Sequence, residues 1–490
     1  MSQTLILALI VLYFGVLLLV SYVTSRKADN QTFFAANKSA PWYLVAFGMV
    51  GTSLSGVTFI SVPGTVSAVG FTYFQVVLGY FIGYFAVAYI LLPLYYKMQL
   101  TSIYTYLQER FGMVSYKTGA AFFILSRTLG ATLRLYLVIN VLQLYVLESM
   151  GVPFWATSVI ILFMILMYTY KGGVKTIVWT DTLQTFFMLL ALIVCVVYIL
   201  NNLNLGFGEA FSMMSDRGFT TLFSGDPMDK KFFLKQILGG AFITITMTGL
   251  DQEMMQKNIS VKNLGDSQKN MITFSSIMVI VNFLFLMLGG LLYLYAERYQ
   301  LTLTGDDLFP TVAMQHLPGV ISLIFIIGLI SALFPSADGA ITALTASFCI
   351  DILGMQRDAN KTEEEKMKLR KRVHLSFAAV FLVFVFYFKW LNDKSIINTL
   401  LDIAGYTYGP LLGLFVFGIF SKQKVRDHLT PIACIIPPVL TFLINTTSPY
   451  WAGGYKFGLE LLIINGAMTA GMLFLFREKQ SGIVPVDRVK

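Results

Sequence analysis

The chain alternates between long apolar runs and short polar segments. A helix that spans a membrane needs about 20 consecutive, mostly apolar residues, and many runs reach this length. The pattern predicts about thirteen membrane-spanning helices. Their approximate limits are 3–23, 42–63, 71–96, 118–147, 154–170, 180–201, 236–256, 271–296, 319–350, 374–391, 395–420, 429–447 and 457–476.

One apolar run, 46–63, differs from an ordinary membrane anchor. Its middle, residues 51–56, reads Gly-Thr-Ser-Leu-Ser-Gly and is therefore small and hydroxylated. Inside a bilayer, backbone groups leave the helical hydrogen-bond ladder only where protein or a cavity surrounds them. Interrupted helices near the midplane are typical of ion and substrate sites in transporters. The alternative is that small residues allow neighbouring helices to pack closely, and this segment alone leaves both interpretations open.

Composition narrows the class of protein. Of the 490 residues, 56% are hydrophobic and 12% are charged, whereas soluble domains carry about 25% charged residues. We therefore expect an all-α polytopic membrane protein with a single transmembrane domain over 1–490. The net charge of +9 does not indicate nucleic-acid binding, because Lys and Arg in membrane proteins mostly hold cytoplasmic loops in place. Their excess on the side of residues 24–41 predicts a protein of the cell (inner) membrane with its N-terminus outside and its C-terminus in the cytoplasm.

Two arginines lie within the predicted span 118–147. Ionisable groups inside a membrane are expensive and so are functional candidates. Arg127 and Arg134 share one helix face with Gly130 between them. A guanidinium offers a planar fork of donors that suits a carboxylate. No acidic residue occurs between Lys117 and Leu147, so any partner comes from another helix or from a substrate. For Arg134 we favour a structural pairing, and for Arg127 both roles stay open.

An acidic residue, Asp338, lies in the middle of the span 319–350. Thr342 and Thr345 follow it at helical spacing, and Pro335 frees a backbone carbonyl one turn earlier. A carboxylate, hydroxyls and free carbonyls together suit a hard cation such as sodium. The alternative is an Asp that only forms hydrogen bonds with neighbouring helices.

A second acidic residue, Asp181, follows a polar connection. Gly172 and Gly173 are expected to turn the chain, and Thr180 with Asp181 is expected to start the next helix. An N-cap role alone would explain this Asp.

These motifs together resemble the sodium/solute symporter family, which is built on the inverted five-helix repeat of the bacterial leucine transporter. The resemblance covers essentially residues 1–476. It implies an extra N-terminal helix at about 3–23, repeats at about 42–201 and 236–420, and two further helices at about 429–476. It is carried by Phe34, Pro41-Trp42, Thr52 to Ser55, 101–107 with Arg110-Phe111, Gly172-Gly173 through Thr180-Asp181 and Gln184, Ser336 to Ala340 with Asp351-Ile352, and 409–413.

The resemblance implies sodium as the coupling ion. The family's common sodium site maps to Gly51, Leu54, Ala332, Pro335 and Ser336. Pro335 stands where the family usually has Ser, so one hydroxyl ligand is missing. Some members have a further sodium site, which would use Asp181 and Asp338 here.

The resemblance also implies a substrate pocket. The matching residues on the first two helices of the repeat are Ser53, Ser55, Thr58, Tyr73 and Gln75, and Val57 argues weakly against a hexose site. Sialic-acid transporters of the family place an arginine on the third-helix face, and the candidate match is Arg127.

The expected function is a sodium-coupled secondary active symporter that imports a small polar organic solute, most simply an anionic one such as a carboxylate or acidic sugar. A neutral sugar or polyol is the alternative, and a transporter-like channel or sensor is the alternative outside transport. A sensor would normally carry an appended signalling domain, for which we expect no room. An enzyme is not expected, because Ser53 and Ser55 have no histidine partner within a span. The expected partners are the solute, sodium ions and the lipid bilayer.

Overall fold

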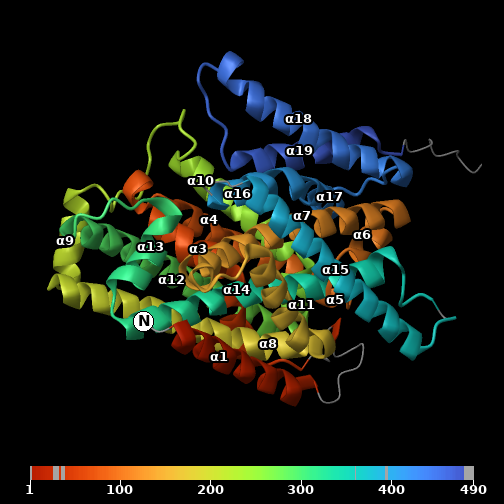
Figure 1. Cartoon of the computed structure of the whole chain (residues 1–490). Helices are drawn as coiled ribbons and strands as arrows, with labels where there is room; N and C mark the ends of the chain where they lie inside the picture. Colours follow the sequence, from red (N-terminus) through yellow and green to blue (C-terminus); the bar gives the residue numbers. More distant parts are fainter. Residues whose placement is uncertain (1–2, 26–32, 35–38, 359, 392–395, 479–490) are drawn as a thin grey trace, which may run out of the picture.

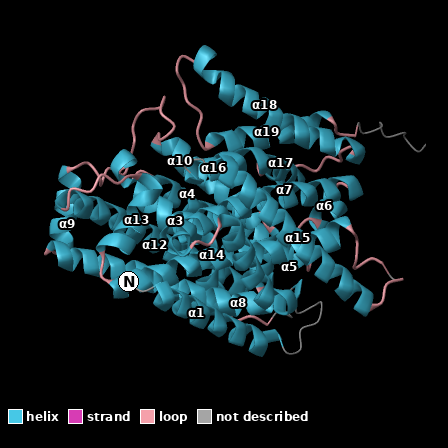
Figure 2. Ribbon diagram, viewed as in Figure 1, coloured by secondary structure: helices cyan, strands magenta, loops and turns pink. Residues whose placement is uncertain are grey.

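The computed structural model describes residues 3–25, 33–34, 39–358, 360–391 and 396–478, and this part of the chain is helical without any β-strand (Figures 1 and 2). The predicted all-α class is therefore confirmed. The longer helices are α1 (Gln3–Ser25), α3 (Trp42–Val69), α4 (Tyr73–Ala86), α7 (Met113–Leu142), α8 (Phe154–Leu203), α9 (Phe207–Asp216), α10 (Phe233–Thr244), α11 (Gln252–Ile259), α12 (Leu264–Arg298), α14 (Gly319–Ser347), α15 (Glu363–Leu391), α16 (Ile396–Thr407), α17 (Gly409–Phe420), α18 (Thr430–Trp451) and α19 (Glu460–Leu475).

The helices are long and apolar enough to form a multi-pass bundle. Within the described residues, nine helices could cross a membrane, or up to eleven if each of two bent pairs forms one span. Two further apolar helices, Phe154–Tyr170 and Glu460–Leu475, are shorter. Every predicted run overlaps a helix, but the predicted count of thirteen is not confirmed.

A buried helix, α3, lies at the centre of the bundle and packs against α8, α12 and α14. At one edge α1 packs on α8, and at the opposite edge α18 and α19 lie over α16 and α17 (Figure 1). The middle of α3 is therefore surrounded by other helices, and an interrupted helix in a membrane requires protein or a cavity around it.

Among the described helices, two that are broken bear on the candidate site. In α3 the break is at Ser55, whose φ of 39° and ψ of 172° are far from helical. The helix Phe233–Gly249 and α11 meet at a bend of 65°. The break at Ser55 lies within residues 51–56, so of the two interpretations left open for this segment the structure supports the interrupted helix. The bend before α11 lies inside the run 236–256, which the sequence pattern treats as continuous. Each broken helix begins one of the two predicted repeats, whose limits stay a prediction.

The connection at 171–181 differs from its prediction. The two predicted spans 154–170 and 180–201 are joined in α8, with a local departure at Gly173 (φ 55°, ψ −142°). Gly173 is needed there because a Cβ would lie 2.6 Å from the Cα of Phe33. Asp181 lies well inside the helix that follows Gly173, so the predicted N-cap role for Thr180 and Asp181 is wrong.

Contact between α4 and α10 depends on glycine. A Cβ at Gly79 would collide with the backbone oxygen of Ile237 and lie 2.9 Å from the amide nitrogen of Ala241. Small residues let helix backbones approach this closely in membranes. We expect Gly79→Ala to destabilise the protein by about 1–3 kcal/mol, because α10 must move. Thermal unfolding in detergent tests this, and Gly15→Ala, which has open space around it, should leave the melting temperature unchanged or higher. An equal melting temperature for Gly79→Ala would contradict the close packing.

Candidate functional site

The residues predicted for the common sodium site lie where α3 and α14 meet, and all five are buried. In a regular helix the Gly51 carbonyl would accept from the amide of Ser55, and the break falls at Ser55. Pro335 has no N–H, so the carbonyl of Ser331 also lacks its usual helical donor. Backbone oxygens at these two interruptions are suited to a hard cation. Ser336, whose hydroxyl donates to the Leu333 carbonyl at 2.8 Å, adds a further oxygen.

The Thr185 hydroxyl also belongs to this region. Its oxygen lies 3.1 Å from the amide nitrogen of Gly51 and 3.5 Å from the Gly48 carbonyl oxygen. A Cβ at Gly51 would collide with this hydroxyl, which explains the glycine. The structure therefore places one more polar group from α8 beside the broken segment of α3.

A buried ionic network lies next to this region. The Lys257 Nζ on α11 lies 2.6 Å from Asp181 Oδ2 on α8 and 2.7 Å from Thr52 Oγ1 on α3. The Thr52 hydroxyl also donates to Asp181 Oδ2 at 3.0 Å. The Lys257 side chain is 4% exposed and that of Asp181 is 1% exposed. The sequence pattern places Lys257 in a cytoplasmic loop, and the structure corrects this: it is an interior cation that joins three helices.

The same network continues to α7. Glu253 Oε1 lies 3.5 Å from Lys257 Nζ, and its other carboxylate oxygen accepts a hydrogen bond from Arg127. Arg127 also lies 3.8 Å from Asp251 Oδ2, and this oxygen accepts from the Tyr408 hydroxyl at 3.0 Å. Two carboxylates from another helix thus neutralise Arg127.

Asp338 is buried on α14 and accepts a hydrogen bond of 2.7 Å from the Tyr168 hydroxyl. The charges of both Asp181 and Lys257 act on it, so the two predicted acidic residues belong to one electrostatic cluster. Thr345, predicted on the same face, instead lies 3.1 Å from His374 Nδ1. The use of Asp181 and Asp338 by a second sodium ion stays a prediction.

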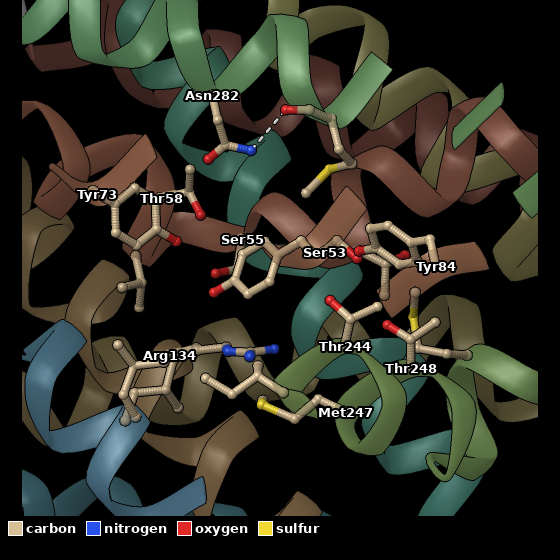
Figure 3. A pocket seen from close by; sticks show the side chains of 18 of the residues that line it. Ser53, Ser55, Thr58, Tyr73, Tyr84, Arg134, Thr244, Met247, Thr248 and Asn282 are labelled. Atoms are coloured by element: carbon tan, nitrogen blue, oxygen red, sulfur yellow. Dashed lines mark hydrogen bonds between the residues drawn. The ribbon is translucent and has the colours of Figure 1, made fainter. Parts of the chain in front are cut away.

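A pocket opens beside the break in α3 (Figure 3). Five of the six predicted substrate residues line it: Ser53, Ser55, Thr58, Tyr73 and Arg127. Lining residues that the sequence analysis did not single out for the substrate are Thr52, Tyr80, Tyr84, Arg134, Thr244, Met247, Thr248, Met278 and Asn282.

Gln75 lies outside the pocket lining. Its Nε2 donates to the Thr72 carbonyl at 3.0 Å and reaches the Lys231 carbonyl at 3.4 Å. The side chain therefore holds the start of α4 against the connection between α9 and α10, and its predicted contact with substrate stays a prediction.

Among the described residues, Arg134 faces the pocket without a counter-ion. Its guanidinium points into the space among Ser55, Thr244 and Met247 (Figure 3). The residue is 8% exposed, and within the described part of the chain no carboxylate pairs with it and its Nε has no hydrogen-bond partner. The described contacts thus give Arg127 two carboxylate partners and give Arg134 none. Arg127 also lines the pocket, and its predicted contact with substrate stays a prediction.

Comparisons with known proteins agree with this architecture. Residues 33–427 match the model of the sodium:solute symporter family. The sodium/sialic acid symporter NanT of Aliivibrio fischeri is 25% identical over 94% of this chain and 92% of its own. The sodium/sialic acid symporter SiaT of Proteus mirabilis is 24% identical over 94% of this chain and 93% of its own.

Solved structures share the fold. A substrate-bound, outward-open Na+-coupled sialic acid symporter superimposes with a TM-score of 0.83 at 20% identity, covering 96% of this chain and 97% of the other. Mhp1, a nucleobase-cation-symport-1 family transporter in a closed conformation, gives a TM-score of 0.57 at 12% identity, covering 91% and 93%. With its many apolar helices and a family match over most of its length, the chain is a multi-pass membrane protein that belongs to the sodium:solute symporter family.

Proposed function

We propose that this symporter imports a small anionic solute of the acidic-sugar class, together with sodium, and that Arg134 binds the solute's carboxylate. The observation that carries this proposal is the buried guanidinium of Arg134 in the pocket, with no carboxylate beside it among the described residues. A buried charge is stable only when something compensates it. The carboxylate of an incoming solute would do so through a two-pronged, charge-assisted contact.

The rest of the pocket suits a polyhydroxylated molecule. Hydroxyl groups line it from several helices, on Ser53, Ser55, Thr58, Tyr73, Tyr80, Tyr84, Thr244 and Thr248. Such groups both donate and accept hydrogen bonds, so they could bind the hydroxyls of a sugar. A neutral sugar or polyol is therefore the second candidate.

Uptake into proteoliposomes separates the two candidates. The test compares labelled N-acetylneuraminic acid, a simple monocarboxylate, a neutral hexose and a polyol, each with and without an inward sodium gradient. We expect saturable uptake of the acidic sugar that requires the gradient. Preferred uptake of a neutral sugar would contradict the assignment of Arg134, and uptake that ignores sodium would contradict the coupling.

The entry of sodium supplies the driving force for uptake. With a cytoplasm that is electrically negative, each inward positive charge contributes about 2.3 kcal/mol per 100 mV. Sodium at the break in α3 and solute in the adjacent pocket would each raise the other's affinity by the same factor.

We propose that the N-terminus is outside and the C-terminus is in the cytoplasm, as the distribution of Lys and Arg predicts.

We propose that Ser336 contributes to the common sodium site. Ser336→Ala should raise the sodium concentration for half-maximal uptake several-fold, because an oxygen ligand is lost where Pro335 supplies no hydroxyl. The measurement is the sodium dependence of initial uptake rates at fixed solute. Ser376→Ala on the exposed face of α15 is the matched control and should leave this value unchanged. An unaltered sodium dependence in Ser336→Ala would remove Ser336 from the site.

A further inference from the structure

We propose that the ε-ammonium of Lys257 is a tethered cation that fills the ion position beside Asp181, so that no second sodium ion binds there. The proposal rests on the proposed sodium coupling for one point, the number of sodium ions that the protein binds. The Lys257 ammonium takes the place of an exchangeable ion.

The geometry around Lys257 is that of a cation site with oxygen ligands. Carboxylate oxygens of Asp181 and Glu253 and the hydroxyl of Thr52 lie at 2.6, 3.5 and 2.7 Å from Nζ. An ammonium group has three N–H donors, which matches these three oxygens. Carboxylate and hydroxyl oxygens are also the ligands that a hard cation such as sodium prefers. Ammonium and sodium would therefore compete for the same atoms.

The position of Lys257 is fixed by the start of α11. Asp251 caps this helix, and its Oδ1 accepts from the amides of Glu253 and Met254 at 2.9 and 3.2 Å. On α14, Gly339 leaves the room that the Glu253 carboxylate occupies, because a Cβ there would collide with Glu253 Oε1. The Lys257 side chain is 4% exposed. The ammonium thus reaches Asp181 from a capped, buried helix and is part of the chain, so it cannot leave as a free ion would.

Repulsion by the Lys257 ammonium is the reason that sodium would not bind to the same oxygen of Asp181. The Asp181 carboxylate already has a full positive charge at 2.6 Å. A sodium ion placed on the same carboxylate oxygen would face a like charge within a few ångströms, in surroundings that screen charge poorly. Occupation of the site is therefore independent of sodium concentration, and the ion that couples to transport binds where the broken α3 meets α14.

The test counts the sodium ions that the purified full-length protein binds at saturation, with radioactive sodium and matched protein quantification. We expect one ion for the wild type and one more than the wild type for Lys257→Met, because the vacated oxygens become available. The double variant Lys257→Met with Asp181→Asn should return to the wild-type number. Lys262→Met, which removes an exposed lysine nearby, is the control and should match the wild type.

An unchanged count in Lys257→Met would overturn the proposal. If Lys257→Met does not fold, the single variant Asp181→Asn provides the test. An unchanged number of bound sodium ions in Asp181→Asn supports the proposal, and a loss of one ion overturns it. A wild type that binds no sodium, with one ion in Lys257→Met, would support the tethered cation and contradict the proposed sodium coupling, so the two failures are distinguishable.

Discussion

Replacing Arg134 with Gln should raise the solute concentration needed for half-maximal uptake by roughly 10- to 100-fold, because a hydrogen bond to a charged group contributes about 1.5–3 kcal/mol. The guanidinium lines the pocket and has no carboxylate partner in the described part of the chain, so the loss should fall on solute binding. The sodium concentration for half-maximal uptake should change much less when it is measured at saturating solute. Initial uptake rates in proteoliposomes, with solute and sodium varied in turn, give both values.

Two further variants make this result specific. Arg134→Lys should recover only part of the affinity, since an ammonium keeps the charge but lacks the planar fork. Arg372→Gln removes an exposed arginine of α15 by the same chemical change and should behave as the wild type. Full affinity in Arg134→Gln would show that this arginine does not bind the solute.

The second large effect concerns stability. Arg127→Met should destabilise the protein by about 3–5 kcal/mol, the usual result of removing one partner from a buried ion pair. Glu253 and Asp251, both buried, would lose the cation that they share. The expected readouts are a lower melting temperature in detergent and a lower yield of folded protein.

A double-mutant cycle checks the origin of that loss. Arg127→Gln and Glu253→Gln should each destabilise, and their combination should destabilise by less than the sum, because residues in one ionic network are coupled. Arg134→Gln should leave the melting temperature close to that of the wild type, since no ion pair is broken. Additive losses in the cycle would contradict the direct pairing of Arg127 with Glu253.

Local chemistry in the sequence marks the position of the broken helix, although it does not decide between a break and close packing. The stretch Gly51 to Gly56 is small and hydroxylated within an apolar run, and α3 departs from helical geometry at Ser55 inside that stretch. The glycines allow neighbouring helices to pack closely against α3, and the hydroxyl side chains are compatible with an interrupted backbone hydrogen-bond ladder. Ser53, Ser55 and Thr58 lie at or near this break and line the pocket, and their binding of substrate stays a prediction.

The pairing of charges could not be predicted in the same way. Arg127 and Arg134 share a helix face, and within their own span nothing distinguishes them. Their difference comes from α11, whose Asp251 and Glu253 reach Arg127 and not Arg134. Tertiary packing decides which residue more than a hundred positions away becomes the partner. Helical periodicity carries no information on that packing.

The burial of Lys257 escaped the sequence analysis for a related reason. It follows the apolar run 236–256 and has the position of a loop residue, yet the bend of 65° before α11 turns it into the bundle. A signal was present, since Asp251 and Glu253 lie inside this run and Lys257 follows Glu253 by four residues, about one helical turn. These charged residues indicate an interior network only when the helix break is known.

The most direct test of the account uses a pair of ligands that differ only in the carboxylate. Binding of N-acetylneuraminic acid and of its carboxamide is measured on the wild type and on Arg134→Gln at saturating sodium. We predict that the wild type binds the acid roughly 10- to 100-fold more tightly than the amide, and that Arg134→Gln binds the two with nearly equal affinity. Equal affinities in the wild type, or a preference for the acid that survives in Arg134→Gln, would contradict the proposed recognition of an anionic solute by Arg134.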